Sequence, residues 1–471
     1  GCGALELHPK LLQMKNGLGL YHSRIGRPYW IVGKMIDSKP RKIQSPHLVD
    51  ANFVDITRKD FFSTWIKTDT LGLNVEPRCA SCLKAPECKV CKGMASPASF
   101  QEQEDAKVIK THVNCDFVQK RVTATLPFKR DPHVTFHPSK SNKELVEKMA
   151  LNLKKGLTRD NLLRSYTESF QEAVERGVYV EVSDEDIRIH DESGLPSNYV
   201  SHHAVLKPNS KTYSCRPVVN SSTPHSGTTL NEEVLKGGKV ISNLLHVMMR
   251  SREHPFLLIC DVSRAYNAIL MNSSLDQHCR RLLWYRLEDL EKEDPPLRHY
   301  LASTACFGDK PSGYFLEEAK SQLAAWCAQQ GPEWRQTQEA IELNSYVDDL
   351  IKSLRLRGEA IELMERIPLA FEQLGFKLKP IVLIGPGEDV PEDLPDEDML
   401  LGYRYNYRED AFTVNFKVNF SSRRRSARIC PDLLEDSELE GMKFTPASLL
   451  SLQASQFDPL GFSTPFLSKG K

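Results

Sequence analysis

Apolar residues repeat at two different spacings along this chain, and the change of spacing predicts where helices give way to strands. In residues 141–178 they return about every fourth position, as in Leu145, Met149 and Leu153, which predicts helical structure. Residues 198–222 alternate between apolar and polar side chains and contain many β-branched residues, which predicts strands. The chain is therefore expected to belong to the α+β class.

A longer series of predicted elements begins near residue 254. An apolar run at 256–260 predicts a buried strand that ends at Asp261. A helix, an acidic hairpin at 344–353, a second helix and a strand at 377–384 follow in that order. The first helix is predicted from an amphipathic stripe formed by Phe315, Leu316, Ala319, Leu323 and Trp326. The order β-α-β-β-α-β is that of the split βαβ motif.

Two adjacent carboxylates, Asp348 and Asp349, stand at the tip of the predicted hairpin. Together with Asp261 they can converge on two divalent cations about 3.5–4 Å apart, which is an arrangement that drives phosphoryl transfer. An Asp-Asp pair in a turn is more commonly turn chemistry, because Asp side chains bond nearby backbone groups. The order of elements around the pair favours catalysis, and it is the layout of a template-copying polymerase.

Composition limits where nucleic acid can bind. The 471 residues suggest about three domains, and 62 basic residues balance 62 acidic ones. Because the chain has no overall positive field, a nucleic-acid groove must come from local clustering. The clearest basic cluster is Arg423, Arg424, Arg425 and Arg428, which is either a solvated loop or a nucleic-acid patch.

The sequence also bears on compartment. No stretch approaches the roughly 18 apolar residues of a membrane span, and residues 1–4 show no signal peptide. The missing initial Met indicates a fragment or a processed product. Twelve cysteines without a secretory signal indicate an intracellular, reducing setting, in which they are free thiols or metal ligands.

Four cysteines form two C-x2-C pairs separated by five residues, namely Cys79, Cys82, Cys88 and Cys91. Four thiolates suit a structural Zn²⁺, although the gap is shorter than in zinc ribbons. Reduced surface thiols are the alternative, and an iron–sulfur cluster would use the same ligands. His202 and His203 lack a thiolate or carboxylate at ligand spacing, so we expect a structural role for them.

From about residue 125 to 471 the chain resembles the reverse transcriptase of BEL/Pao-type LTR retrotransposons. The resemblance rests on the acidic hairpin together with Arg216-Pro217-Val218-Val219-Asn220-Ser221-Ser222, Leu230-Asn231, Leu235-Lys236-Gly237-Gly238, Phe307-Gly308-Asp309-Lys310-Pro311 and Phe457-Asp458-Pro459-Leu460-Gly461. It implies a right-hand polymerase with fingers at 126–250, a split βαβ palm at 251–385, and the thumb and start of the connection at 386–471. The cysteine-rich stretch 41–125 would be a linker before it.

Residues 1–40 look like the last strands of the element's aspartic protease. The similar segments are Leu5-Glu6-Leu7-His8-Pro9, Leu18-Gly19-Leu20-Tyr21-His22-Ser23-Arg24-Ile25-Gly26 and Trp30-Ile31-Val32-Gly33. The catalytic Asp-Thr/Ser-Gly is not present upstream of them. We therefore expect a β-rich protease remnant without protease activity.

The resemblance also assigns roles near the acids. Asp261 and Asp348 would ligate two Mg²⁺ ions, with Asp349 beside them and the carbonyl of Val262 on the nucleotide-bound ion. Tyr266, five residues past Asp261, would exclude a nucleotide 2′-hydroxyl by shape. The alternative for this residue is a core tyrosine.

Other residues would form the nucleotide pocket. Arg216 would grip the incoming triphosphate, with Lys207 and Lys211 as weaker candidates for a second contact. Phe307 and Gly308 would shape the pocket floor, because glycine permits close backbone approach.

Two further roles follow from the resemblance. Lys379 would protonate pyrophosphate, in competition with Lys377, and either of them is otherwise simply solvated. The segment Leu401-Gly402-Tyr403 is similar to the primer-grip turn.

The expected function is RNA- and DNA-templated DNA synthesis by two-metal nucleotidyl transfer. The expected partners are a primed RNA or DNA template, deoxynucleoside triphosphates and other parts of a retroelement polyprotein, with no membrane. The expected location is a cytoplasmic retroelement particle or the nucleus. One alternative is a truncated or decayed relic that binds nucleic acid without extending it. A zinc-dependent nucleic-acid module is another, but it explains only residues 79–91.

Overall fold

The computed structural model describes residues 10–15, 18–22, 29–33, 100–206, 215–238, 242–386 and 397–413. The chain divides into two compact units, Gly1–Val75 and Glu76–Lys471. In the first unit, three described strands pair in sequence order as an antiparallel sheet, β1 (Lys10–Lys15), β2 (Leu18–His22) and β3 (Tyr29–Gly33).

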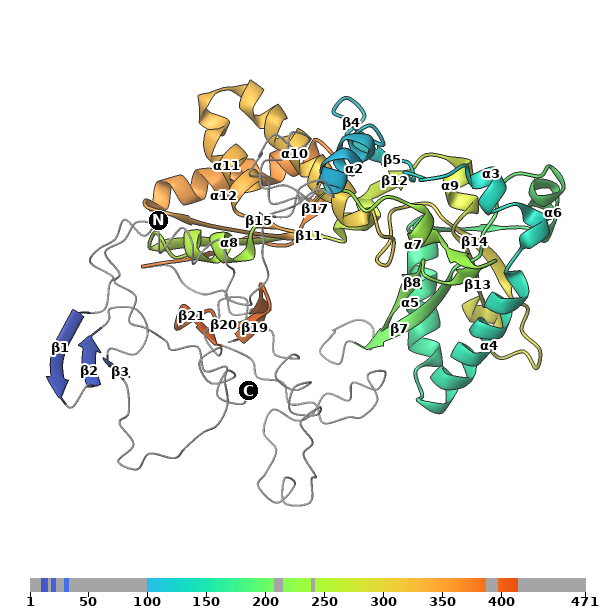
Figure 1. Ribbon diagram of the computed structural model, residues 1–471, viewed down its shortest axis with the longest axis horizontal. Coiled ribbons are helices and arrows are strands. Elements are labelled where there is room, and N and C mark those ends of the chain that lie inside the picture. The colour runs from blue at the N-terminus through green and yellow to red at the C-terminus, as the bar shows by residue number, and fades with distance from the viewer. Residues whose placement is uncertain are drawn as a thin grey trace, which may run out of the picture. The chain divides into compact units, whose positions relative to one another are not determined.

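The second unit contains the predicted split βαβ motif (Figure 1). Its strands are β11 (Phe256–Ser263), β15 (Ser345–Tyr346), β16 (Asp349–Leu354), β17 (Lys377–Leu378) and β18 (Val382–Ile384). They are ordered β15-β16-β11-β17, with β18 also on β11, and all pairs are antiparallel. The helices α10 (Ser312–Gln330), α11 (Arg335–Leu343) and α12 (Arg357–Glu372) connect them. The predicted strands and helices occur in the predicted order, but the segment 269–302 adds three strands and a short helix between β11 and α10.

Two details of this motif differ from the prediction. The first strand does not end at Asp261, because Val262 and Ser263 still pair with Leu378 and Lys377 of β17. The strand predicted at 377–384 is two short strands that pair with different parts of β11. The five residues of the predicted apolar stripe all lie in α10, and this helix also buries charged residues.

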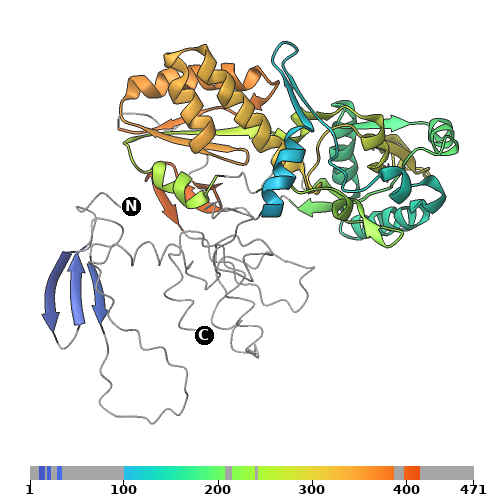
Figure 2. The same ribbon diagram turned by 45° about the horizontal axis from the view of Figure 1, so that its top comes forward.

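Alternating side chains of β11 face two separate cores. Leu258 and Cys260 belong to the larger core with residues of α10 and α12, whereas Leu257 and Ile259 belong to a second core. That second core is completed by α8 (Leu244–Arg250) and by the antiparallel strands β19 (Glu397–Leu400), β20 (Tyr403–Asn406) and β21 (Ala411–Thr413). Helices α10 and α12 therefore cover one face of the sheet, and α8 with the β19–β21 meander covers the other (Figure 2).

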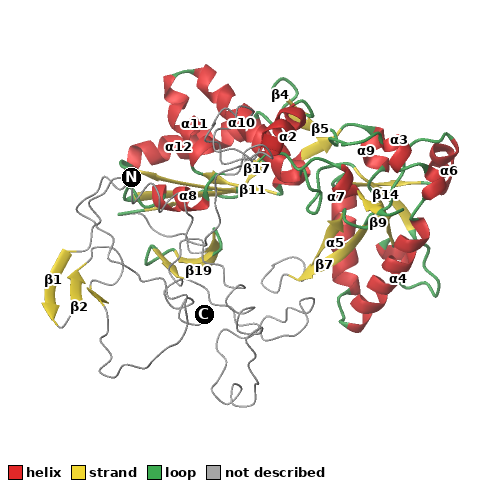
Figure 3. Cartoon of the chain, in the orientation of Figure 1, coloured by secondary structure: helices red, strands yellow, loops and turns green. Residues whose placement is uncertain are grey.

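Further strands and helices make up the rest of the second unit (Figure 3). The predicted helices at 141–178 are α4 (Lys143–Arg159) and α5 (Leu163–Glu175), and the predicted strands at 198–222 are β7 (Ser201–Leu206) and β8 (Cys215–Asn220). The remaining described elements are α2 (Phe100–Lys110), β4 (Val113–Asp116), β5 (Arg121–Ala124), α3 (Pro132–Thr135), β6 (Tyr179–Val182), α6 (Asp184–Glu192), β9 (Pro224–His225), β10 (Thr228–Thr229), α7 (Leu230–Glu233), β12 (Ile269–Met271), α9 (Ser274–His278), β13 (Arg281–Trp284) and β14 (Arg298–Ala302).

Two segments lie where the sequence pattern did not place them. Strand β12 pairs in parallel with β5, and β14 pairs with β6, so part of the range 251–385 builds sheets with the residues before it. Within the range 41–125, Ile109, Val113 and Val122 belong to the main core. Over the described ranges, no helix combines the length and the apolar character needed to cross a membrane.

Candidate active site at the acidic hairpin

The register of β11 and β16 brings the backbones of three acidic residues together at one edge of the sheet. Asp261 lies directly opposite Asp349 in this antiparallel pair. The backbone N–H of Val262 donates to the carbonyl oxygen of Asp348 at 2.8 Å, which fixes the turn to the neighbouring strand. The convergence of Asp261 with the hairpin acids, expected from the sequence, therefore follows from backbone pairing.

The hairpin turn has an unusual backbone. Val347 and Asp348 form a two-residue turn between β15 and β16, and Val347 has a φ of 55°. A left-handed conformation is uncommon for a β-branched residue, and it persists only where the surrounding structure holds it. This turn sets the backbone position from which Asp348 projects.

Electrostatics at the edge favour a bound cation. Burial raises the pKa of Asp348 above its usual range and the charge of Asp261 raises it further, while Lys379 and Lys320 offset part of the shift. The ammonium of Lys379 lies 3.0 Å from Oδ1 of Asp261, and the Lys379 N–H donates to the Asp261 carbonyl at 2.9 Å. The acidic residues at this edge thus already attract one positively charged group, the ammonium of Lys379.

The groups near Asp348 would suit a magnesium ion that is held only partly by the protein. Over the described ranges, no group of three or more His, Cys, Asp or Glu side chains is arranged to hold a metal ion. Mg²⁺ commonly takes one or two carboxylates and completes its shell with water and substrate phosphates. Asp261, Asp348 and the carbonyl of Val262 are the groups that would supply such a partial shell.

Tyr266 and Phe307 meet beside the carboxylates. Their rings pack edge to face with centroids 4.7 Å apart, and Phe307 is 54% exposed. Burial raises the pKa of Tyr266, and the charges of Asp348 and Glu317 raise it further. Tyr266 is half-buried, packs against the main core and lies close to Asp348.

Gly308 joins the Phe307 loop to strand β8. Its φ is 107°, and a Cβ at this position would lie 2.0 Å from the carbonyl oxygen of Val219. The side chain of Asn231 donates to the Gly308 carbonyl at 2.9 Å. Arg216 is exposed on the same strand. The loop therefore packs directly against β8, and only glycine at position 308 allows the two backbones to approach this closely.

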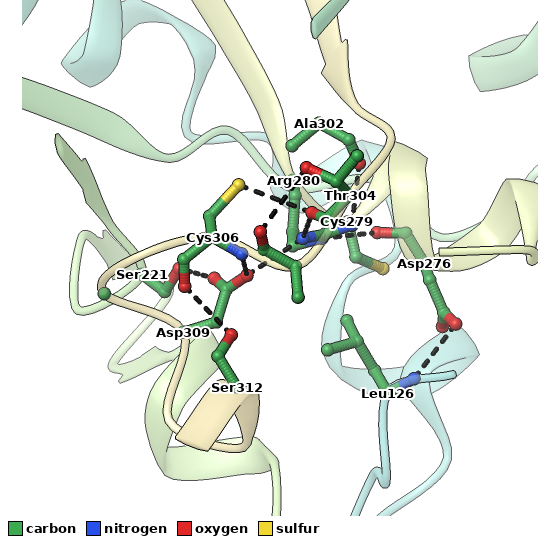
Figure 4. Close-up of polar contacts among 12 residues, drawn as sticks. Leu126, Ser221, Asp276, Cys279, Arg280, Ala302, Thr304, Cys306, Asp309 and Ser312 are labelled. Carbon is green, nitrogen blue, oxygen red and sulfur yellow. Dashed lines mark hydrogen bonds and ion pairs between the residues drawn. The ribbon is translucent and has the colours of Figure 1, made fainter. Parts of the chain in front are cut away.

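A buried ion pair behind this loop has no counterpart in the roles expected from the sequence (Figure 4). The Arg280 guanidinium is fully buried and donates to Asp309 Oδ2 at 2.9 Å and to the carbonyls of Ala302 and Thr304, both at 2.7 Å. Asp309 also accepts from the Ser221 hydroxyl at the end of β8. The pair anchors residues 306–309 to β8. Asp309 is visible in the Phe307–Pro311 motif, but the sequence does not identify Arg280, 29 positions away, as its partner.

The primer-grip candidates form a tight turn between β19 and β20. Leu401 and Gly402 have φ values of 52° and 86°, as a type I′ hairpin requires. The side chains of Leu401 and Tyr403 are buried in the second core, whereas Gly402 is exposed. The exposed part of this turn is therefore mainly backbone.

Other candidates fall into two groups. His202 is buried, its Nε2 lies 3.1 Å from the Leu283 carbonyl oxygen, and burial lowers its pKa to about 4, which confirms the structural role expected for it. The remaining candidates lie outside the described residues, namely Lys207, Lys211, Cys79, Cys82, Cys88, Cys91 and the cluster Arg423, Arg424, Arg425 and Arg428.

Comparisons with known proteins find solved structures that are similar to this chain, and two of them are described below. No family model matches the chain, and no curated protein matches it. The chain is similar to the foamy viral protease-reverse transcriptase dRH in complex with ds DNA, with a TM-score of 0.39 and 14% identity over 77% of this chain and 52% of that one. It is also similar to the foamy viral protease-reverse transcriptase in complex with RNA/DNA hybrid, with a TM-score of 0.38 and 12% identity over 77% and 40%. The chain thus spans about half the length of these proteins or less, and likeness at this level establishes no activity.

Proposed function

We propose that the chain is a reverse transcriptase that makes DNA on RNA and DNA templates, as part of a BEL/Pao-type retrotransposon polyprotein. The observation that carries the proposal is the placement of the acids. Asp261 lies opposite Asp349, and Val262 is bonded to Asp348, at the edge of a split βαβ sheet. This arrangement supports nucleotidyl transfer because it brings the backbones of these acidic residues together, where their carboxylates and substrate phosphates would share the metal ions.

In this proposal Asp261 and Asp348 hold two Mg²⁺ ions, with Asp349 beside them and the Val262 carbonyl as a further ligand. When bound, the ions lower the pKa of the primer 3′-hydroxyl and stabilise the leaving pyrophosphate. In the same proposal Lys379 donates a proton to pyrophosphate, which is supported by its exposure and its position next to Asp261.

The remaining pocket roles rest on exposure and packing. Tyr266 and Phe307 present an edge-to-face aromatic pair beside Asp348, which suits exclusion of a ribose 2′-hydroxyl by shape. Arg216, exposed on β8, would bind the triphosphate. The exposed backbone at Gly402 would contact the primer strand.

The larger organisation belongs to the same proposal. Residues 126–250 are assigned to fingers, 251–385 to palm, and 386–471 to the thumb and the start of the connection. Within the palm range, β14 pairs with β6 of the fingers range, and β12 pairs with β5, which precedes it. The template–primer would be bound through backbone and shape rather than sequence. We assign structural Zn²⁺ to Cys79, Cys82, Cys88 and Cys91, and a cytoplasmic particle or the nucleus as the location.

Primer extension tests the proposal. The full chain is incubated with a primed RNA template, Mg²⁺ and deoxynucleotides, beside Asp348→Asn and Asp116→Asn. Asp116 is a matched control, because its carboxylate only accepts the N–H groups of Val118 and Gln119, at 3.0 and 2.9 Å, in another hairpin turn. We expect extension by the wild type and the control but not by Asp348→Asn.

Two other outcomes would change the conclusion. A folded wild-type chain that binds template–primer but does not extend it would refute the polymerase and leave a nucleic-acid-binding relic. Equal loss of extension in both Asp→Asn variants would show that turn chemistry, rather than a catalytic carboxylate, explains the effect.

A further inference from the structure

Helix α10 carries a polar stripe on a buried face beneath the acidic hairpin. The stripe consists of Gly313, Glu317 and Lys320, which share a face because they are four and three positions apart. The side chains of Glu317 and Lys320 are only 8% and 3% exposed, and they form an ion pair at 2.8 Å. Burying two charges is costly even when they are paired, so an apolar pair would serve packing at least as well.

The Lys320 ammonium reaches the hairpin directly. It donates to the carbonyl oxygen of Val347 at 2.8 Å and to the Ser345 hydroxyl at 3.2 Å. Ser345 in turn donates to the carbonyl of Ile341 at 2.6 Å, so its hydroxyl is fixed from behind. Lys320 therefore holds the peptide group that joins Val347 to Asp348, and Val347 is the residue with the left-handed φ.

The other end of the stripe lies against Tyr266. A Cβ at Gly313 would be 3.9 Å from the Tyr266 hydroxyl, so the absence of a side chain leaves room for that group. The charge of Glu317 also raises the pKa of Tyr266. One helix face thus touches both the aromatic pair and the turn of the candidate site.

We propose that Lys320 is a positioning residue, which holds the Val347 carbonyl and thereby sets Asp348 against Asp261, with Glu317 keeping the ammonium in place. The proposal rests on the proposed function, because it assigns Lys320 a role in forming the cation site. The proposal predicts a change in divalent-cation affinity that is opposite in direction to the change expected from charge alone. A positive charge near the site repels a divalent cation, so charge removal alone would tighten binding. Loss of the grip would weaken it.

Manganese binding gives the direct test without requiring activity. Mn²⁺ is titrated into the full chain and free ion is measured by electron paramagnetic resonance, and sites lost in Asp348→Asn are taken as hairpin sites. Lys320→Met is compared with Lys352→Met. Lys352 is a matched control, because its side chain is 12% exposed and pairs with Glu339 of α11 at 3.4 Å, three positions past Asp349 on β16.

We expect Lys320→Met to weaken Mn²⁺ binding at the hairpin by about tenfold, which is the effect of losing one buried bond to a charged group. Lys352→Met should bind as the wild type does. Unchanged or tighter binding by a folded Lys320→Met chain would overturn the proposal, as would a wild type without hairpin sites.

The single variant leaves Glu317 buried without a partner and is therefore expected to be less stable. The double variant Glu317→Met/Lys320→Met removes both charges and should recover the unfolding temperature while binding remains weak. A stable double variant with wild-type affinity would overturn the proposal. Primer extension separates the two ideas, because wild-type Mn²⁺ binding without extension refutes the polymerase but not the grip. Extension with full kcat in the double variant refutes the grip.

Discussion

Two adjacent arginines, Arg280 and Arg281, allow a controlled test of how the Phe307 loop is held. Both are fully buried, but they face different partners. Arg280 pairs with Asp309, whose side chain is 3% exposed, whereas Arg281 pairs with Asp191, whose side chain is 31% exposed. The same substitution to methionine therefore leaves a buried carboxylate in one case and a partly hydrated one in the other.

The burial of the remaining carboxylate sets the expected magnitude. Removing one partner of a buried ion pair costs about 3–5 kcal/mol, so Arg280→Met should lower the free energy of unfolding by that amount. In Arg281→Met, water reaches Asp191, and the expected loss is about 1–3 kcal/mol. The double variant Arg280→Met/Asp309→Asn removes the stranded charge and should recover part of the loss.

The pH dependence has a defined sign. In Arg280→Met, the ionised form of Asp309 is buried without a partner and opposes folding at neutral pH, so protonation should relieve part of the loss. As pH falls, the folded state takes up a proton more readily than the unfolded state does. The difference in stability between wild type and Arg280→Met should therefore shrink between pH 7 and pH 5.

Urea unfolding followed by circular dichroism at several pH values measures these quantities. The local consequence is read in primer extension, where KM for deoxynucleotides should rise in Arg280→Met more than in Arg281→Met, because only Arg280 anchors residues 306–309. A stability difference that does not change with pH would refute this reasoning. So would a double variant that is no more stable than Arg280→Met.

Two further predictions concern the same edge of the molecule. Gly308→Ala should cost about 1–3 kcal/mol and raise the nucleotide KM, because a Cβ there would lie 2.0 Å from the Val219 carbonyl oxygen at a φ of 107°. Gly358→Ala in α12, where a Cβ meets nothing within 4 Å, is the control and should be neutral or stabilising in thermal unfolding. Asp348→Asn should raise the unfolding temperature in metal-free buffer at pH 7, because burial and Asp261 raise the folded pKa of Asp348 and make its ionised form unfavourable. That gain should shrink as pH falls, and a gain that persists at low pH would contradict the charge explanation.

The local apolar pattern was sufficient for the sheet that carries the acids. The continuous apolar run before Asp261 predicted a strand buried on both faces, and its residues do alternate between two cores. The acidic hairpin was predicted for the same reason, since apolar residues on both sides of Asp348 and Asp349 fit a short paired segment. The strand and the hairpin both depend on residues that are close together in the sequence, so the apolar pattern is enough to predict them.

Pairings between distant segments were not predictable in this way. Strand β12 is parallel to β5 although about 145 residues separate them, and nothing in either three- or four-residue segment identifies the other. The burial of Glu317 and Lys320 in α10 was not predictable for a related reason. Their ion pair, and the bond from Lys320 to the Val347 carbonyl 27 positions away, allow both side chains to be buried.

The two lysines near Asp348 differ in a way that bears on how a cation enters. Lys320 is buried and bonded to the backbone, whereas the side chain of Lys379 is 60% exposed and reaches only the edge of the site at Asp261. Salt screens an exposed ion pair strongly and a buried one weakly. We infer that Lys379 is the exchangeable cation, displaced from Asp261 when a divalent ion binds. Lys320 remains fixed, because leaving its position would break its bond to Val347 and strand Glu317. Both lysines offset negative charge at Asp348, but in this inference only Lys379 would leave when a divalent ion binds, whereas Lys320 would stay and hold the turn.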